Sequence, residues 1–167
     1  LSPDLCGEEP LALCWTALRE DAPISALFKM NAARSCDEFR EALRDWTAPT
    51  QNTVYADKQG NIGYTLAGRI PLRIKGDGRL PVPGWTGAYE WNGYIPFEES
   101  PHMNNPQKGY VATANNKVVN DDYPYYLGLD VGMGNRCQRI EEMIGKIERH
   151  SVEDIGRMQI DQVSITA

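Results

Sequence analysis

The sequence Asn105-Pro106-Gln107-Lys108-Gly109-Tyr110-Val111-Ala112-Thr113-Ala114-Asn115-Asn116 indicates a turn, a β-strand and two carboxamides at the end of that strand. The Asn-Pro and Lys-Gly steps are typical of turns, and the run from Tyr110 to Thr113 favours a strand. A carboxamide at a strand end is a neutral N–H donor, which suits chemistry that builds negative charge on an oxygen. Asn after a strand more commonly forms an Asx-turn or a cap. The residues alone leave both interpretations open.

The composition is that of an ordinary globular chain. Its 167 residues are about the length of one domain, and 41% are hydrophobic and 24% charged. The formal net charge is −6 and no basic cluster occurs, which argues against a nucleic-acid partner. The sequence lacks a run of about 18 apolar residues, so we expect no membrane span.

The four cysteines are unevenly spaced, without a C-x-x-C pair, and the chain has only two histidines. A zinc site is therefore not expected. Cys14 and Cys137 occupy apolar positions of periodic segments, which predicts buried thiols. A disulfide from Cys6 to Cys14 or Cys36 stays open, because its geometry cannot be judged from sequence.

The first third of the chain reads as one strand and two helices. Periodicity allows either a strand or a helix over residues 11–18, and the length favours a strand. Residues 23–31 have near-helical apolar spacing. Ser35 and Glu38 form a potential capping box for a second helix. That helix would bury residues at i, i+4 and i+7, namely Phe39, Leu43 and Trp46.

A β-hairpin is predicted over residues 52–67, with Gly60 at a turn position that needs positive φ. No period survives over residues 69–108, which predicts a long irregular loop. The loop holds five aromatic residues: Trp85, Tyr89, Trp91, Tyr94 and Phe97. We expect their burial to pin the loop to a core. Lining a substrate pocket is the alternative.

Two helices are predicted after the Asn pair. The first begins near Arg136 and carries an apolar stripe that we expect to be core: Cys137, Ile140, Met143, Ile144 and Ile147. Ser151 and Asp154 indicate the start of the second. Together with the hairpin, these elements predict an α+β fold.

Four motifs upstream of the Asn pair add a family resemblance. They are YADKQGNIGY (residues 55–64), GRIP (68–71), LPVPGW (80–85) and EWNGYIPF (90–97). In this order and near this spacing, with the strand and Asn pair that follow, they resemble the penicillin amidase (penicillin acylase) family of N-terminal nucleophile hydrolases. The resemblance runs from about Leu11 to Ser164.

The resemblance implies a fold and an activity. The fold is part of an αββα sandwich, with antiparallel strands, flanking helices and a long irregular loop. The activity is cleavage of N-acyl amide bonds through an acyl-enzyme on an N-terminal Ser, exposed when a precursor is cut. Leu1-Ser2-Pro3 does not match the context of that nucleophile. We therefore expect residues 1–167 to be a single partial domain, an internal segment of a β-chain that is inactive alone.

The resemblance also assigns two site residues. The family's oxyanion-hole Asn corresponds to Asn115, and its Arg, which orients the Asn and the α-amino group, corresponds to Arg136. A free α-amino group has a pKa near 8, so it can serve as the base without a His. Asn116 is expected to be a turn residue or a support behind Asn115. An Arg in the first turn of a helix is disfavoured by the helix dipole, which adds to the case for a functional role of Arg136.

Calcium is often bound near the active centre of this family. One ligand position falls at Gly78 and another near residues 125–127, where no carboxylate stands. Asp77 and Asp130 could substitute as oxygen donors. We expect no cofactor in this chain, and calcium stays open for the full-length protein.

The expected partners are the remainder of the β-chain, the α-chain and a small N-acyl substrate, and the isolated chain is expected to self-associate. We expect the parent protein to be periplasmic or extracellular. One competing hypothesis is a non-catalytic binding or scaffold module. Another is a stand-alone hydrolase that uses Ser2 or a Cys. A Cys nucleophile needs a His, and we expect His102 and His150 to be loop and solvent-face residues.

Overall fold

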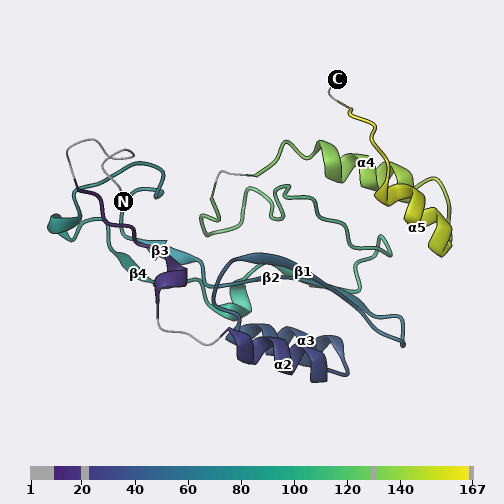
Figure 1. Cartoon of the computed structure of the whole chain (residues 1–167), viewed down its shortest axis with the longest axis horizontal. Coiled ribbons are helices and arrows are strands. Elements are labelled where there is room, and N and C mark those ends of the chain that lie inside the picture. Colours follow the sequence, from purple (N-terminus) through teal and green to yellow (C-terminus); the bar gives the residue numbers. More distant parts are fainter. Residues whose placement is uncertain (1–9, 20–22, 129–130, 166–167) are drawn as a thin grey trace. The chain divides into compact units, whose positions relative to one another are not determined.

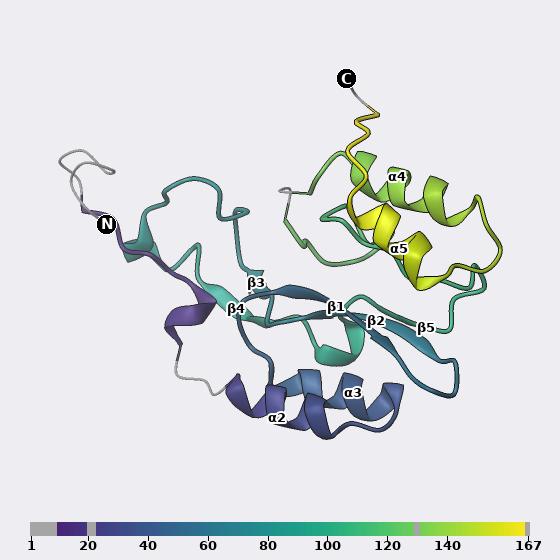
Figure 2. The ribbon, with the colours of Figure 1, turned by 45° about the vertical axis from the view of Figure 1, so that its right-hand side comes forward.

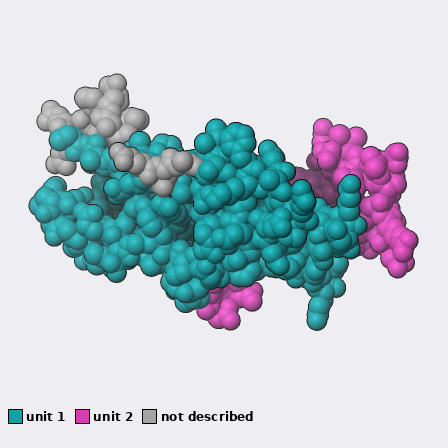
Figure 3. Space-filling model, turned by 90° about the horizontal axis from the view of Figure 1, so that it is seen from below, with its two compact units in different colours: residues 1–109, 124–127 teal, residues 110–123, 128–167 magenta. Residues whose placement is uncertain are grey.

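The computed structural model describes residues 10–19, 23–128 and 131–165. It contains helices and antiparallel sheets, which confirms the predicted α+β class. The chain divides into two compact units, coloured separately in Figure 3. Unit 1 comprises residues 1–109 and 124–127, and unit 2 comprises residues 110–123 and 128–167.

A β-hairpin forms the centre of unit 1 (Figure 1). Strand β1 (Gln51–Ala56) pairs antiparallel with β2 (Ile62–Ala67). In the turn, Oδ1 of Asp57 accepts the backbone N–H of Asn61 at 2.9 Å, and Gly60 has a φ of +90°. The side-chain amide of Asn61 also donates to the Asp57 carboxylate, at 2.8 Å. This hydrogen bond is the largest cause that holds the pKa of Asp57 below its usual range, and backbone N–H groups of the turn add to it. The predicted hairpin and its glycine are confirmed.

Short strands occupy the segment 69–108, which the sequence predicts to be an irregular loop. β5 (His102–Asn104) pairs antiparallel with β2, so the three-stranded sheet has the order β1-β2-β5. β3 (Pro71–Arg73) pairs with β4 (Trp91–Tyr94) in a second, irregular pair. Strands of three or four residues are too short to leave a periodic signal.

The aromatic residues of this segment divide into packed and exposed ones. Trp91 and Tyr94 on β4 are half-buried and meet edge to face, with ring centroids 6.2 Å apart. Trp85 lies in the single turn η3 (Gly84–Thr86) and is 89% exposed. The expectation that burial pins the loop is therefore wrong for Trp85.

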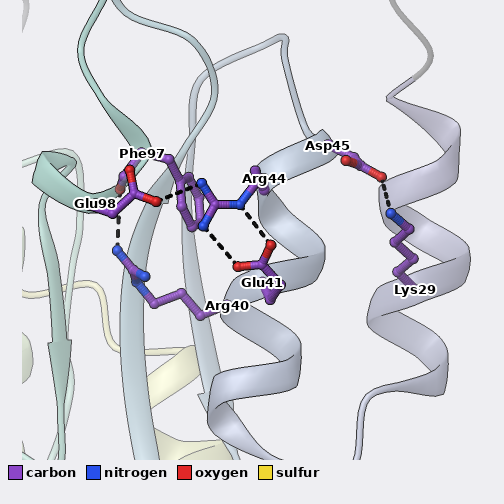
Figure 4. A network of polar contacts seen from close by, with 7 residues as sticks. All are labelled: Lys29, Arg40, Glu41, Arg44, Asp45, Phe97 and Glu98. Atoms are coloured by element: carbon purple, nitrogen blue, oxygen red, sulfur yellow. Dashed lines mark hydrogen bonds and ion pairs between the residues drawn. The ribbon is translucent and has the colours of Figure 1, made fainter.

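Two helices lie beside each other against the hairpin (Figure 2). They are α2 (Ile24–Ala32) and α3 (Cys36–Ala42), and α3 continues into the turn η2 (Leu43–Asp45). Both predicted helices are confirmed, and α3 contacts β1 and β2. An ion pair between Lys29 and Asp45 joins α2 to η2 (Figure 4).

Ser35 caps α3, and its hydroxyl accepts the backbone N–H of Glu38 at 3.1 Å. The reciprocal contact differs from the predicted capping box. The Glu38 carboxylate accepts the backbone N–H of Arg34, at 2.8 Å, in place of that of Ser35. The acidic side chain still satisfies a donor ahead of the helix.

Two arginines fasten α3 and η2 to the turn η4 (Phe97–Glu99) (Figure 4). The guanidinium groups of Arg40 and Arg44 lie 4.6 and 4.4 Å from the ring centroid of Phe97. Arg44 also bridges Glu41 and Glu98, each at 2.7 Å. Its hydrogen bond holds the pKa of Glu98 below the usual range. Cation–π and ionic contacts therefore join segments about fifty residues apart.

The strand predicted over residues 11–18 is wrong. The segment belongs to neither sheet, and its only regular element is the turn η1 (Thr16–Leu18). Without a neighbouring strand to satisfy its backbone, an apolar run does not become a strand. Cys14 is exposed, which corrects the expected buried thiol. Cys6 lies outside the described residues, and Cys14 and Cys36 carry free thiols.

Unit 2 contains α4 (Asn135–Ile144) and α5 (Val152–Gln159), which lie side by side in both ribbon views. Both predicted helices are confirmed, and Ser151, at the predicted start of α5, forms a capping box with Asp154. Arg139 of α4 makes a two-pronged ion pair with Asp161, beyond α5, with both contacts at 2.8 Å.

The apolar stripe of α4 is only partly core. Cys137 is buried, but Ile147, just beyond the helix, is 45% exposed. Across the described residues, no helix is both long and apolar enough to cross a bilayer. The strand predicted over residues 110–113 is not formed either, because this segment belongs to neither sheet.

Candidate functional site

Asn115 follows the segment 110–114 in a tight backbone turn. Its φ is +59°, in the left-handed region, and its carbonyl oxygen accepts the backbone N–H of Gly132 at 2.7 Å. Asn tolerates this conformation better than most residues, whereas a β-branched residue would be strained there. The side chain of Asn115 is exposed.

Arg136 lies at the second position of α4 and reaches back to this turn. Its Nη2 donates to Oδ1 of Asn115 at 2.7 Å and to the carbonyl oxygen of Ala114 at 2.9 Å. The two sequence-predicted site residues are therefore in direct contact within unit 2. The two oxygens also offset the unfavourable position of a cation at a helix N-terminus.

This contact sets the orientation of the Asn115 amide. A guanidinium has no acceptor, so the side-chain oxygen must face Arg136 and the NH₂ group must face away. Within residues 110–123, 128 and 131–165, no group accepts a hydrogen bond from Nδ2 of Asn115. The arrangement leaves an oriented, uncharged donor at the surface of unit 2.

Asn116 uses its side chain inside the same turn. Its Oδ1 accepts the backbone N–H of Ala114 at 2.9 Å, and its Nδ2 donates to the carbonyl oxygen of Lys117 at 3.0 Å. Both polar ends of this carboxamide are therefore engaged with backbone. The geometry distinguishes the two Asn residues, one presenting a donor outward and the other bracing the chain.

Sequence reasoning did not single out two other residues of this turn. The N–H of Gly132 holds the carbonyl of Asn115, and a Cβ at Gly132 would lie 3.4 Å from that oxygen. The Thr113 hydroxyl is buried and has no hydrogen-bond partner among the described residues. Gly132 lies in a glycine-rich run ahead of α4, which is visible in the sequence. The spacing of that run does not indicate that Gly132 donates to the carbonyl of Asn115.

A separate cavity of about 240 Å³ in unit 1 brings a cysteine and a histidine together. Cys36 and His102 both line it, as a Cys-dependent hydrolase would require. However, burial raises the pKa of the Cys36 thiol, with further contributions from Asp37 and Asp57. Nδ1 of His102 donates to the carbonyl oxygen of Ser100 at 2.7 Å. This environment disfavours a thiolate, so the cavity does not support a Cys nucleophile. Ser2 lies outside the described residues.

The second histidine is structural. Nε2 of His150 donates to the carbonyl oxygen of Ile144, the last residue of α4, at 2.9 Å. The side chain is half-buried, which corrects the expected solvent-face position. It satisfies one of the carbonyl groups left over at the end of the helix.

Asp77, one of the two expected oxygen donors for calcium, already has a cationic partner. Asp77 is engaged by Arg79, whose Nε donates to the carboxylate at 2.6 Å, and this holds the pKa of Asp77 below its usual range. Asp130 lies outside the described residues. Residues 10–19, 23–128 and 131–165 contain no group of three His, Cys, Asp or Glu side chains placed to hold a metal.

Comparison with known proteins places the chain in one family. The family model described as penicillin amidase matches residues 3–167. The chain is 37% identical to the penicillin acylase 2 proenzyme of Pseudomonas sp. (strain SE83) over 144 residues, covering 86% of this chain and 19% of that protein. It is 34% identical to the acyl-homoserine lactone acylase QuiP of Pseudomonas aeruginosa, covering 87% of this chain and 17% of that one. The chain thus spans less than a fifth of the length of these relatives.

A solved structure agrees with this placement. The thermostable penicillin G acylase from Alcaligenes faecalis matches with a TM-score of 0.65 and 31% sequence identity, over 80% of this chain and 24% of that one. Its similarity confirms the antiparallel α+β architecture. The described fold, the order of the sequence motifs and the family match lead to one conclusion: this chain belongs to the penicillin amidase family.

Proposed function

We propose that this chain is part of an amidohydrolase that cleaves N-acyl amide bonds, and that it supplies the oxyanion-binding donor, Nδ2 of Asn115. The observation that carries the proposal is the contact of Arg136 with Oδ1 of Asn115, because it turns the amide N–H group outward. A donor fixed in advance stabilises developing negative charge without reorganising during the reaction.

The proposed reaction begins at an N-terminal Ser that lies in another part of the protein. Its α-amino group takes the proton of the hydroxyl, and the oxygen attacks the amide carbonyl. The carbonyl oxygen becomes an oxyanion, which accepts a hydrogen bond from Asn115. Collapse expels the protonated amine and leaves an acyl-enzyme. Water then attacks the ester with the same α-amino group as base, releases the carboxylic acid and restores the Ser.

Arg136 has a second part in this proposal. Its guanidinium keeps the amide of Asn115 oriented and places a fixed positive charge close to the developing oxyanion. The same charge lowers the pKa of a neighbouring α-amino group, which would keep that group neutral and able to act as a base. We assign Arg136 to orienting Asn115 and the α-amino group.

The proposed substrate is an amide that joins an acyl chain to a small amine. Relatives named penicillin acylase and acyl-homoserine lactone acylase support this class. Because the chain spans less than a fifth of their length, the nucleophile and the acyl pocket are assigned to the remainder of the protein. The proposed partners are therefore the remaining β-chain, an α-chain and the N-acyl substrate.

The test measures release of a chromogenic amine from phenylacetyl anilides and anilides of longer acids. The intact, processed parent protein should turn them over, and the isolated chain should not. Turnover by the isolated chain that persists through further purification would contradict the assignment of the nucleophile to another segment. An intact protein that hydrolyses none of these amides would contradict the proposed reaction and favour a scaffold role.

A further inference from the structure

Asn116 ties together the backbone on both sides of Asn115. Its Oδ1 accepts the N–H of Ala114, and its Nδ2 donates to the carbonyl of Lys117. We propose that Asn116 is a positioning residue for the reaction, acting through Asn115 without touching the substrate. This inference rests on the proposed function, because it presupposes that Asn115 is the oxyanion donor.

The backbone of Asn115 needs such support. Its φ of +59° is sparsely populated for a residue with a side chain, and such conformations persist when the surroundings fix them. Among the described residues, three groups outside Asn115 hold this turn by hydrogen bonds. Gly132 holds the Asn115 carbonyl, Arg136 holds the Ala114 carbonyl, and Asn116 holds the Ala114 N–H.

Asn116 has a specific place among these three contacts. Gly132 and Arg136 bind carbonyl oxygens, so neither can satisfy the N–H of Ala114. Loss of the Asn116 carboxamide would leave that N–H without its partner and free the peptide group between Thr113 and Ala114. The oxygen of Asn115 would stay close to Arg136, but the direction of Nδ2 depends on the backbone that carries it.

The expected consequence is a loss of turnover without a loss of binding. A small misplacement of a catalytic group is enough to slow an enzyme strongly. We expect Asn116→Ala to lower kcat by about 10-fold while KM changes little, since the oxyanion exists only beyond the ground state. Asn116→Ser keeps a shorter acceptor and should lower kcat less.

The experiment uses the intact parent protein, with kcat determined per processed chain on a phenylacetyl anilide. It compares Asn116→Ala, Asn115→Ala, the double variant and Asn116→Ser. Asn120→Ala is the matched control, because Asn120 is exposed and its side chain makes no hydrogen bond among the described residues. Asn116→Ala should slow the native enzyme about 10-fold but slow the Asn115→Ala background less than twofold.

The double variant separates positioning from simple damage to the fold. A residue that acts through Asn115 loses its effect when the Asn115 amide is absent, whereas a folding defect lowers activity in both backgrounds. Two results would overturn the inference, provided that Asn115→Ala itself lowers kcat strongly. One is a wild-type kcat in Asn116→Ala. The other is an equal loss of kcat on adding Asn116→Ala to the wild type and to Asn115→Ala. If Asn115→Ala itself is harmless, the proposed oxyanion role fails first.

Discussion

Arg136 donates a hydrogen bond from Nη2 to Oδ1 of Asn115, across 2.7 Å, and the same nitrogen reaches the carbonyl of Ala114. Both acceptors belong to one turn, so a single cation fixes the side chain and the backbone that carries it. The arrangement needs no charged group at the donor. It leaves Asn115 as a neutral N–H donor beside a positive charge, which suits an oxygen that becomes negative.

Replacing Arg136 should slow turnover by releasing this donor. Arg136→Met keeps an unbranched side chain but removes the N–H groups, so the Asn115 amide can rotate. We expect kcat to fall by about 10- to 100-fold in the processed parent protein. Arg149→Met, an exposed arginine of the same unit, serves as the control and should behave as wild type. Steady-state kinetics on one acyl anilide measures both. Wild-type kcat in Arg136→Met would remove Arg136 from the mechanism.

Alkylation of Cys36 should show an unusual pH dependence. Burial raises the pKa of its thiol, so at any given pH a smaller fraction is thiolate than for an ordinary cysteine. Its alkylation rate should therefore rise only at higher pH than that of a free cysteine in solution. Exposed Cys14 reports reagent access in the same sample. Mass spectrometry of both peptides across a pH series gives the rates. A Cys36 rate that plateaus near neutral pH would contradict this environment.

The ion pair of Arg139 with Asp161 should make unit 2 sensitive to acid. Hydrogen bonds from Arg139 lower the pKa of Asp161 in the folded protein. A carboxyl group with a lowered folded pKa adds stability above its unfolded pKa of about 3.9 and loses that contribution as the pH falls through the folded value. Asp161→Asn should therefore weaken amide protection in α4 and α5 at neutral pH.

The difference in amide protection between Asp161→Asn and wild type should shrink as the pH falls below about 4. Hydrogen exchange followed by mass spectrometry measures the protection of both helices. Asp121→Asn is the control, because Asp121 is 98% exposed in its pair with Lys117 and such surface pairs contribute little. A gap between wild type and Asp161→Asn that stays constant with pH would show that the ion pair does not set the stability of this unit.

Gly63 should resist substitution because of one neighbour. A Cβ added there would lie 2.6 Å from Sγ of Cys36, across the contact between β2 and α3. Gly63→Ala should cost about 1–3 kcal/mol of stability through overpacking. The double variant with Cys36→Ala removes the clashing sulfur and should recover most of that loss. Urea denaturation of the four proteins measures the coupling. Equal losses with and without the sulfur would place the strain elsewhere.

The sequence predicts the elements that carry their own local signals. The hairpin has Asp57 and Gly60 in its turn, and α5 has the capping box that begins at Ser151. Both signals arise within a few residues, so they are visible without knowing the fold. The Ser35 cap was also predicted, but the partner of Glu38 was not, because a shift by one residue leaves the sequence pattern unchanged.

Elements that depend on distant partners were missed. β5 exists because its backbone pairs with β2. A strand of three residues is too short to show a recognisable alternation of polar and apolar residues. Residues 11–18 and 110–113 have strand-like sequences but belong to neither sheet. At the site, the resemblance to a family indicated Asn115 and Arg136. The hydrogen bonds of Asn116 and Gly132 depend on the path of the backbone. The spacing of residues in the sequence does not predict that path.

The central claim is that the amide of Asn115 stabilises the oxyanion, and Asn115→Ala in the processed parent protein tests it most directly. Removing one such donor should lower kcat by about 10²- to 10³-fold. KM should change little, because the ground-state carbonyl gains less from this donor than the oxyanion does. Precursor processing can use the same site, so kcat is measured on chains confirmed as cleaved. Asn116→Ala should cost far less in the same assay. A wild-type kcat for Asn115→Ala, or a larger loss for Asn116→Ala, would contradict the account.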